Sequence, residues 1–214
     1  MTFVATAIAL CLLCSVTTLN ATAGDWQILV LDQDGKPLED AVVELVVLDT
    51  PQPTPPQLPA SVTVKQQGLN FVPFVSAIQV GTAVDFPNMD RTRHHVYSFS
   101  PAKVFEIQLY HGQPEQPVRF DQAGIVALGC NIHDYMEAYV FISNSPLLQV
   151  TNARGEAQFQ SLEAGRYQLR LWHPFQQEDW ALIEVEHKGN SQSQYQLTVQ
   201  HRPKQPTPQR GFGS

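Results

Sequence analysis

Sulfur is scarce in this chain of 214 residues, which contains three cysteines and three methionines. Two of the cysteines, Cys11 and Cys14, lie in an apolar segment at the N-terminus, so the remainder of the chain has Cys130 alone. Exported proteins often use cysteines in pairs, as disulfides. A single thiol in an oxidising compartment is a liability unless it is buried or bound to a metal, and Cys130 therefore requires an explanation.

Clusters of basic residues are also missing. The 13 Lys and Arg residues are scattered along the chain, and the formal net charge is −7. A surface that binds a phosphate backbone needs clustered Lys and Arg. The composition therefore argues against nucleic acid as a partner.

Long apolar runs are absent except near the N-terminus, where residues 3–16 are too few to span a bilayer comfortably. Residues 1–23 carry no charged side chain and end in Ala21-Thr22-Ala23, an A-x-A pattern before Gly24. This pattern is typical of a secretory signal peptide, although an uncleaved anchor helix is the alternative because no positive charge lies near Met1. We expect residues 1–23 to be a signal peptide, and the mature protein to be periplasmic without membrane insertion.

No window shows a sustained helical period, and the chain after Gly24 is a succession of short β-rich runs separated by turn residues. The sequence therefore predicts an all-β fold. The runs that we expect to be strands include residues 26–30, 41–48, 62–65, 82–86, 94–99, 105–109, 117–120, 125–128, 138–142, 181–186 and 195–199. Residues 150–159 read as strand, turn, strand, and residues 162–172 read as a turn followed by a strand.

Proline divides the chain, because residues 50–59 contain five prolines, which cannot donate ladder hydrogen bonds. We expect residues 51–59 to be a linker and residues 60–146 to form one β-domain. The segments 24–50 and 147–200 share a similar pattern of β-rich runs and turns, and each has too few strands to form a hydrophobic core of its own. We expect them to form a second sandwich together, although they could instead extend the first domain, and we expect the tail 201–214 to be disordered.

One short segment concentrates unusual side chains. The run ALGCNIHDYMEAY contains Cys130, His133 and Met136 in a C-x-x-H-x-x-M spacing. Thiolate and thioether sulfur together with imidazole select copper that cycles between Cu(I) and Cu(II). Structural zinc sites would want four Cys or His ligands, and calcium and magnesium want oxygens. The alternatives are a buried cysteine beside a surface histidine, or a Cys–His nucleophilic dyad, which would need a free base and an orienting group.

A trigonal site with two histidines, one cysteine and a weak axial methionine is the blue-copper arrangement, and it needs one more histidine. His94 and His95 open a β-rich run, and adjacent strand residues point to opposite faces. One of the two can therefore face Cys130, and alternation alone leaves open which one. His173 should be structural or exposed, while His111, His187 and His201 should be solvated. No second copper centre is apparent, so we expect an electron carrier and not an enzyme.

These motifs resemble a known family. The run HHVYSF resembles the cupredoxin pattern H-N-V-x-F, which places the first ligand at His94, and C-x-x-H-x-x-M is similar to the ligand loop of amicyanin. Residues 60–175, and especially FPNMDRTRHHVYSFSPAKVFEIQLY and GCNIHDYM, resemble the small exported cupredoxin-like proteins often labelled "methylamine utilization protein". Residues 30–43, 151–155 and 162–169 look like parts of a carboxypeptidase regulatory-like, transthyretin-type sandwich. One departure is Glu137-Ala138, where a pair beginning with Gly is expected.

The resemblance implies a Greek-key cupredoxin β-sandwich inserted in, or flanked by, the regulatory-like sandwich. It implies one copper ion held by His94, Cys130, His133 and Met136, and single-electron transfer between periplasmic redox proteins. It also implies an outer-edge docking patch at His133 with Pro87, Met89 and Tyr135, a hydrogen bond from the His95 amide to the Cys130 sulfur, and either supporting or simple turn-forming roles for Asn88 and Asp90. Competing interpretations are a copper-delivery protein without redox turnover and a metal-free binding module.

Overall fold

The computed structural model describes residues 23–49, 61–180 and 182–200, and every regular element in them is a β-strand. The predicted all-β fold is therefore confirmed. The predicted signal peptide, the proline-rich linker and the tail lie outside the described residues. In the described part of the chain, no helix has the length and apolarity needed to cross a membrane.

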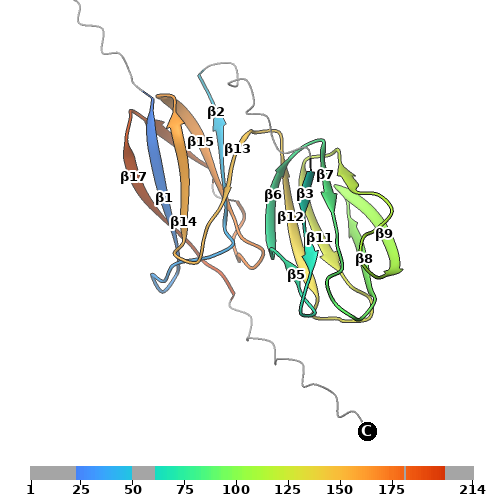
Figure 1. Cartoon of the computed structure of the whole chain (residues 1–214). Helices are drawn as coiled ribbons and strands as arrows, with labels where there is room; N and C mark the ends of the chain where they lie inside the picture. The colour runs from blue at the N-terminus through green and yellow to red at the C-terminus, as the bar shows by residue number, and fades with distance from the viewer. Residues whose placement is uncertain (1–22, 50–60, 181, 201–214) are drawn as a thin grey trace, which may run out of the picture.

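The strands gather into two bodies that lie side by side (Figure 1). The first body combines the beginning and the end of the chain in two sheets, ordered β14-β1-β17 and β13-β2-β15-β16. Its strands are β1 (Gly24–Asp32), β2 (Val42–Val47), β13 (Leu147–Val150), β14 (Glu156–Leu162), β15 (Gly165–Trp172), β16 (Leu182–His187) and β17 (Ser191–Leu197). Strand β17 runs parallel to β1 along its whole length, which joins the two ends of the described chain in one sheet.

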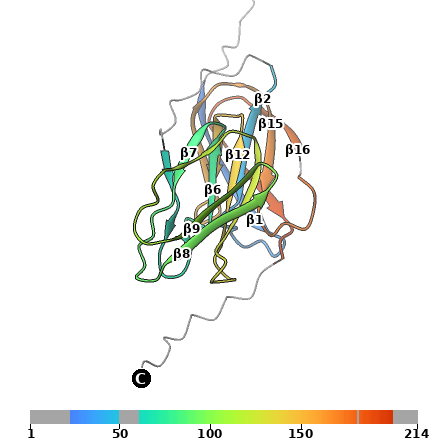
Figure 2. The ribbon, with the colours of Figure 1, turned by 90° about the vertical axis from the view of Figure 1, so that its right-hand side faces the viewer.

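The second body is formed by the middle of the chain, in sheets ordered β6-β12-β11-β8-β9, β10-β7-β3 and β4-β5. Its strands are β3 (Ser61–Thr63), β4 (Lys65–Gln66), β5 (Phe71–Val72), β6 (Val75–Gln79), β7 (Thr82–Asp85), β8 (His94–Ser100), β9 (Lys103–Tyr110), β10 (Val118–Phe120), β11 (Gly124–Gly129) and β12 (Glu137–Ser143). Strands β8 and β9 lie on the side away from the first body, in front in Figure 2.

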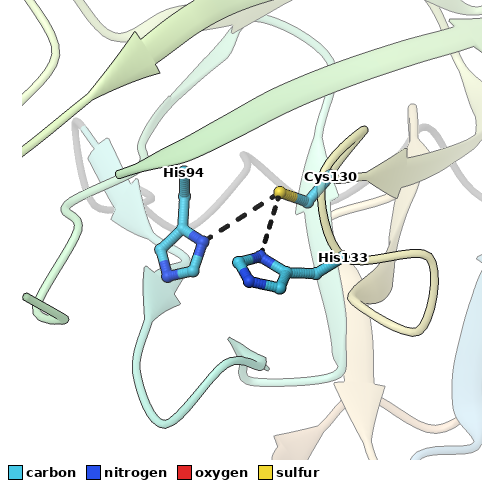
Figure 3. A group of neighbouring side chains, drawn as sticks. All are labelled: His94, Cys130 and His133. Carbon is cyan, nitrogen blue, oxygen red and sulfur yellow. Dashed lines mark hydrogen bonds between the residues drawn. The ribbon is translucent and has the colours of Figure 1, made fainter. Parts of the chain in front are cut away.

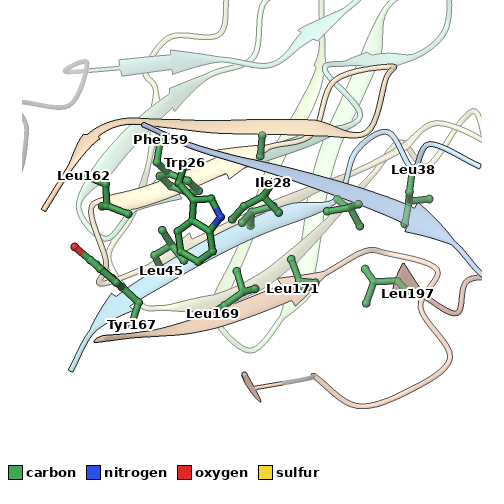
Figure 4. Close-up of a cluster of buried hydrophobic side chains, with 14 of the residues drawn as sticks. Trp26, Ile28, Leu38, Leu45, Phe159, Leu162, Tyr167, Leu169, Leu171 and Leu197 are labelled. Atoms are coloured by element: carbon green, nitrogen blue, oxygen red, sulfur yellow. The ribbon is translucent and has the colours of Figure 1, made fainter. Parts of the chain in front are cut away.

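Each body has its own buried cluster, because alternate residues of its strands face inward. In the first body, Trp26, Ile28 and Val30 of β1 are buried and face Leu169 and Leu171 of β15 (Figure 4). The residues of this cluster all come from outside 60–146. The cluster of the second body, which includes Val84, Phe86, Val96 and Val126, comes entirely from residues 62–142. The division of the chain into two domains at the predicted boundaries, and their independence as folding units, stay predictions.

A third cluster joins the two bodies. Val42 and Trp172 of the first body are packed with Val75 and Phe141 of the second, and the Phe141 and Trp172 rings lie 5.7 Å apart. Polar groups add to this contact. The Ser143 hydroxyl donates to the buried carboxylate of Glu44, which also pairs with Arg170 at 2.9 Å.

One histidine prediction is wrong. His187 was expected to be solvated, but it is 2% exposed, and its ring is stacked on Trp26 with 5.5 Å between the centroids. His187 is the last residue of β16, and the packing of its ring against the Trp26 and Tyr167 rings explains its burial. His173 is buried, and its Nδ1 accepts a hydrogen bond from the Phe175 amide at 3.2 Å. His111 is exposed as expected, and His201 lies outside the described residues.

Candidate metal centre

The C-x-x-H-x-x-M segment forms the connection between β11 and β12, which are antiparallel and paired up to Gly129 and Glu137. Two successive turns make this connection. The His133 amide donates to the Cys130 carbonyl at 3.3 Å, and the Met136 amide donates to the His133 carbonyl at 2.8 Å. Each turn spans four residues, so the spacing of the motif places Cys130, His133 and Met136 at the hydrogen-bonded ends of the two turns.

The fourth residue comes from a neighbouring strand. Strand β8 is antiparallel to β11, with Tyr97 opposite Gly129. Residues that precede Tyr97 therefore lie beside residues that follow Gly129, which brings His94 to the Cys130 loop. The two adjacent histidines have opposite surroundings, as strand alternation requires. His94 Nδ1 lies 4.0 Å from Cys130 Sγ, whereas His95 Nε2 contacts Glu106 Oε1 at 2.7 Å.

Three donor atoms converge in this region. The His94, Cys130 and His133 side chains offer ligand atoms that all lie within 4.8 Å of one another (Figure 3). The His133 Nδ1 atom is 3.7 Å from Cys130 Sγ, and both imidazoles turn Nδ1 toward the sulfur. Among the residues that the structure describes, this is the one group of three such side chains that could hold a metal ion.

The spacing of the donor atoms fits a shared metal ion. With metal–sulfur and metal–nitrogen bonds of about 2.3 and 2.0 Å, two ligands at tetrahedral to trigonal angles stand roughly 3.5–3.7 Å apart. The observed sulfur–nitrogen distance of 3.7 Å to His133 lies at the upper end of this range, and the distance of 4.0 Å to His94 exceeds it by about 0.3 Å. A thiol and two imidazoles form a borderline-to-soft donor set that suits copper or zinc.

The side chains of the site differ in how far they are buried. His94 is fully buried, Cys130 is 2% exposed, and Met136 is 1% exposed in the same core cluster as Cys130. His133 is half-buried and is the one donor of the three that reaches the surface. Burial, followed by the proximity of His94, lowers the pKa of His133, while Asp90 acts in the opposite direction. A lower pKa favours the neutral imidazole that can bind a metal.

Asp90 supports the site from behind His94. Its Oδ2 atom lies 2.9 Å from His94 Nε2, and its carboxylate also accepts hydrogen bonds from the Gly68 and Leu69 amides. Burial alone would raise the pKa of Asp90, but the hydrogen bonds from Leu69, His94 and Gly68 outweigh it and lower the pKa. The carboxylate is therefore ionised at neutral pH.

Asn88 fixes the loop that carries Asp90. Its side-chain amide donates to the carbonyls of Thr92 and Tyr110, both at 2.9 Å, and its Oδ1 accepts from the Asp90 amide. The Tyr110 hydroxyl and the buried Gln66 amide both donate to the Phe86 carbonyl, so the start of the same loop is also held. The sequence drew attention to Asn88 and Asp90 but not to Gln66 or Tyr110.

The predicted docking patch is partly wrong. Met89 is 62% exposed and Tyr135 is half-buried with its ring 5.9 Å from that of His133, but Pro87 is buried. The Pro87 carbonyl accepts a hydrogen bond from the Gln66 amide at 2.9 Å. Ile132, which the sequence did not single out, is 45% exposed next to His133.

Comparisons with known proteins complete the description. No protein-family model matches the chain, and no curated protein matches it. The Cu(I) form of an amicyanin variant is 15% identical over 49% of this chain and 100% of its own, with a TM-score of 0.37. Amicyanin from Paracoccus versutus is 18% identical over 46% of this chain and 97% of its own, with a TM-score of 0.34. A copper-containing nitrite reductase from Thermus scotoductus SA-01 is 25% identical over 46% of this chain and 25% of its own, with a TM-score of 0.36.

TM-scores this low do not establish a shared fold, so the case for a metal rests on the side chains of the site.

Proposed function

We propose that this chain is a periplasmic electron carrier of the cupredoxin type that binds one copper ion. His94 Nδ1, Cys130 Sγ and His133 Nδ1 are its three strong ligands, and Met136 is a weak axial ligand. The observation that carries the proposal is the convergence of the three donor atoms within 4.8 Å, with both Nδ1 atoms turned toward the sulfur. The bound ion would supply the Cu(I)/Cu(II) couple.

The protein's part is to hold the ligands in one geometry for both oxidation states. His94 comes from β8, and the other three come from a loop closed by two turns between β11 and β12. Rigid placement of this kind keeps the reorganisation that accompanies electron transfer small. Three of the four ligands are also almost completely buried, which limits access of water to the thiolate.

Electrons would enter and leave at His133, because it is the ligand that reaches the surface. The exposed side chain of Ile132, the residue before His133, offers apolar contact area, as does that of Met89, the residue before Asp90, and Tyr135 contacts the His133 ring. The partners are redox proteins of the same compartment. The predicted signal peptide supports export, and export supports an oxidising compartment in which a lone cysteine must be protected.

The test is an optical and EPR spectrum of the purified protein loaded with Cu(II), followed by voltammetry. An intense absorption band near ~600 nm, from thiolate-to-Cu(II) charge transfer, and a reversible one-electron wave are expected. Tight Cu(I) binding without the band would instead indicate a copper-delivery protein. Failure to bind copper at all would leave a metal-free β-sandwich module.

A further inference from the structure

We propose that Asp90 is a positioning residue for His94, and that the turn between β4 and β5 is built to hold its carboxylate. The inference rests on the proposed function, since it assigns His94 Nδ1 to the metal. Asp90 would determine which ring nitrogen of His94 carries the proton, and it would place a negative charge next to Nε2 of that ligand.

The contact is direct and shielded from water. His94 is fully buried, the Asp90 side chain is 17% exposed, and His94 Nε2 lies 2.9 Å from Asp90 Oδ2. An ionised carboxylate can only accept a hydrogen bond, so His94 must donate from Nε2. The opposite nitrogen, Nδ1, then keeps its lone pair and faces Cys130 and His133. A carboxylate on the far nitrogen fixes the tautomer and orientation of a metal-binding histidine and raises its basicity.

The carboxylate itself is held by a pair of backbone amides. Gly68 N donates to Asp90 Oδ1 at 2.8 Å, and Leu69 N donates to Asp90 Oδ2 at 3.0 Å. Successive amides that converge in this way form a concave anion-binding nest. The Asp90 amide, in turn, donates to Asn88 Oδ1 at 2.9 Å.

The turn that carries these amides is the two-residue loop of the β4–β5 hairpin. Gly68 and Leu69 have φ values of 63° and 61°, in the left-handed region, and Gln67 and Asn70 exchange backbone hydrogen bonds on either side of them. Positive φ at both central residues is what a type I′ hairpin turn requires, and glycine adopts it more freely than leucine does. This turn directs both amides at Asp90.

The charge of Asp90 has a consequence for the redox couple. A buried anion close to a ligand stabilises the more highly charged Cu(II) state more than Cu(I). Asp90→Asn keeps an oxygen that can accept from Nε2 but removes the charge and the acceptor of the Gly68 amide, whereas Asp90→Ala removes all three. Comparison of the two variants therefore isolates the hydrogen bond to His94, and comparison of Asp90→Asn with the wild type reports mainly the charge.

The first experiment needs no metal. Imidazole ¹⁵N NMR of the metal-free protein at about pH 8, above the ordinary histidine pKa near 6.5, should show His94 as the Nε2–H tautomer. The Asp90→Asn variant should retain this tautomer, and Asp90→Ala should show a mixture. A wild-type His94 protonated at Nδ1 would overturn the proposal, whether or not copper binds.

The second experiment measures the affinities of the loaded protein for Cu(II) and Cu(I). Loss of a supporting partner of this kind typically costs about 10- to 100-fold in metal affinity. In Asp90→Asn we expect the ratio of Cu(II) to Cu(I) affinity to fall about tenfold, which raises the one-electron potential by about 59 mV. An unchanged ratio in a folded Asp90→Asn protein would overturn the role of the charge.

Glu106→Gln is the matched control. Glu106 makes the same kind of contact, at 2.7 Å, with the adjacent His95, whose ring does not face the donor cluster. This variant should change neither the His94 tautomer nor the affinity ratio. Should Asp90→Ala fail to fold by circular dichroism, the Asp90→Asn variant and the wild-type tautomer still decide the question.

Discussion

At the scale of single residues, two adjacent histidines perform different tasks because strand β8 turns them to opposite sides. His94 approaches Cys130, and His95 pairs with Glu106. Replacement of His94 by alanine removes one strong ligand, so the variant should lose the blue absorption band and the reversible wave. His95→Ala should keep both. The measurement is a Cu(II) titration followed by absorbance and EPR, and a colourless His95→Ala protein beside a blue His94→Ala protein would reverse the assignment of the ligand.

Asp40 gives a second residue-scale prediction, on the pH dependence of stability. Burial, assisted by the charge of Glu39, raises the pKa of Asp40 to about 6 from the ordinary 3.8. The folded state therefore binds this proton more tightly than the unfolded state does. The stability that results is complete below about pH 4 and is lost as the pH rises through about 6.

The variant that tests this is Asp40→Asn, because asparagine is neutral and tolerates the left-handed backbone at this position, where φ is 63°. Since the side chain is only half-buried, solvent screening reduces the expected gain to about 1–2 kcal/mol at pH 8. The gain should disappear near pH 4. Urea denaturation of both proteins at the two pH values measures it, and an equal difference at both would contradict the role of ionisation.

The sequence singled out the cysteine and the two histidines that converge, but not the groups around them. The spacing of Cys130, His133 and Met136 is a local property of two turns, so it can be recognised without the fold. Asp90 stood out in the sequence, but turn formation explained it equally well until its contact with His94 was seen. The nest at Gly68 and Leu69 was missed, because it acts through backbone amides and no side chain identifies it.

At the scale of elements, the close packing of β8 on β11 controls the approach to Cys130. Gly129 lies opposite Tyr97, and a Cβ atom at position 129 would lie 2.8–3.1 Å from the Tyr97 ring. Gly129→Ala should therefore push the tyrosine ring aside or shift the end of β11, at a cost of about 1–3 kcal/mol. The displacement should also perturb the Cu(II) spectrum, because Cys130 is the next residue.

A double variant isolates this contact. Adding Tyr97→Val to Gly129→Ala removes the obstacle, so the two changes together should cost less than the sum of their separate costs. Thermal or urea denaturation of the four proteins in the cycle gives the coupling energy. Additive costs would show that the ring is not what excludes a larger residue at position 129.

Element prediction succeeded where one face of a strand is buried and the other is not. β15 was recognised from the alternation of apolar and polar residues within 162–172, and it ends at Trp172 as expected. β8 was recognised from its β-favouring residues, and it extends one residue beyond the expected 94–99. β6 (Val75–Gln79) was missed. It runs parallel to β12 between the two bodies and is partly covered on both faces, so its sequence lacks a clean alternation. The two-residue strands β4 and β5 are too short to carry any pattern.

At the scale of the whole molecule, the question is whether the two bodies are separate folding units. The buried cluster of the first body contains no residue from 60–143, and the cluster of the second body lies wholly within that range. The contact between them is smaller and is centred on Phe141 and Trp172. This distribution favours an inserted domain over a single sandwich extended by additional strands.

Deleting residues 60–143 tests this organisation. The shortened chain keeps both sheets of the first body, and Glu44 keeps its ion pair with Arg170, so no buried charge is left without a partner. It loses the contacts of Val42 and Trp172 with the second body, and loss of a large aromatic partner such as Phe141 typically costs about 3–5 kcal/mol. We therefore expect a β-rich circular dichroism spectrum and one cooperative unfolding transition, at a lower midpoint than in the full chain.

The deletion uncovers the Trp172 ring, which could make the shortened chain insoluble. Replacing Trp172 with Gln should then keep the shortened chain soluble without abolishing the transition, because this ring lies outside the first cluster. A remainder that shows no cooperative transition in either form would mean that the first body depends on the second for its fold, and that the strands on both sides of the metal centre belong to one domain.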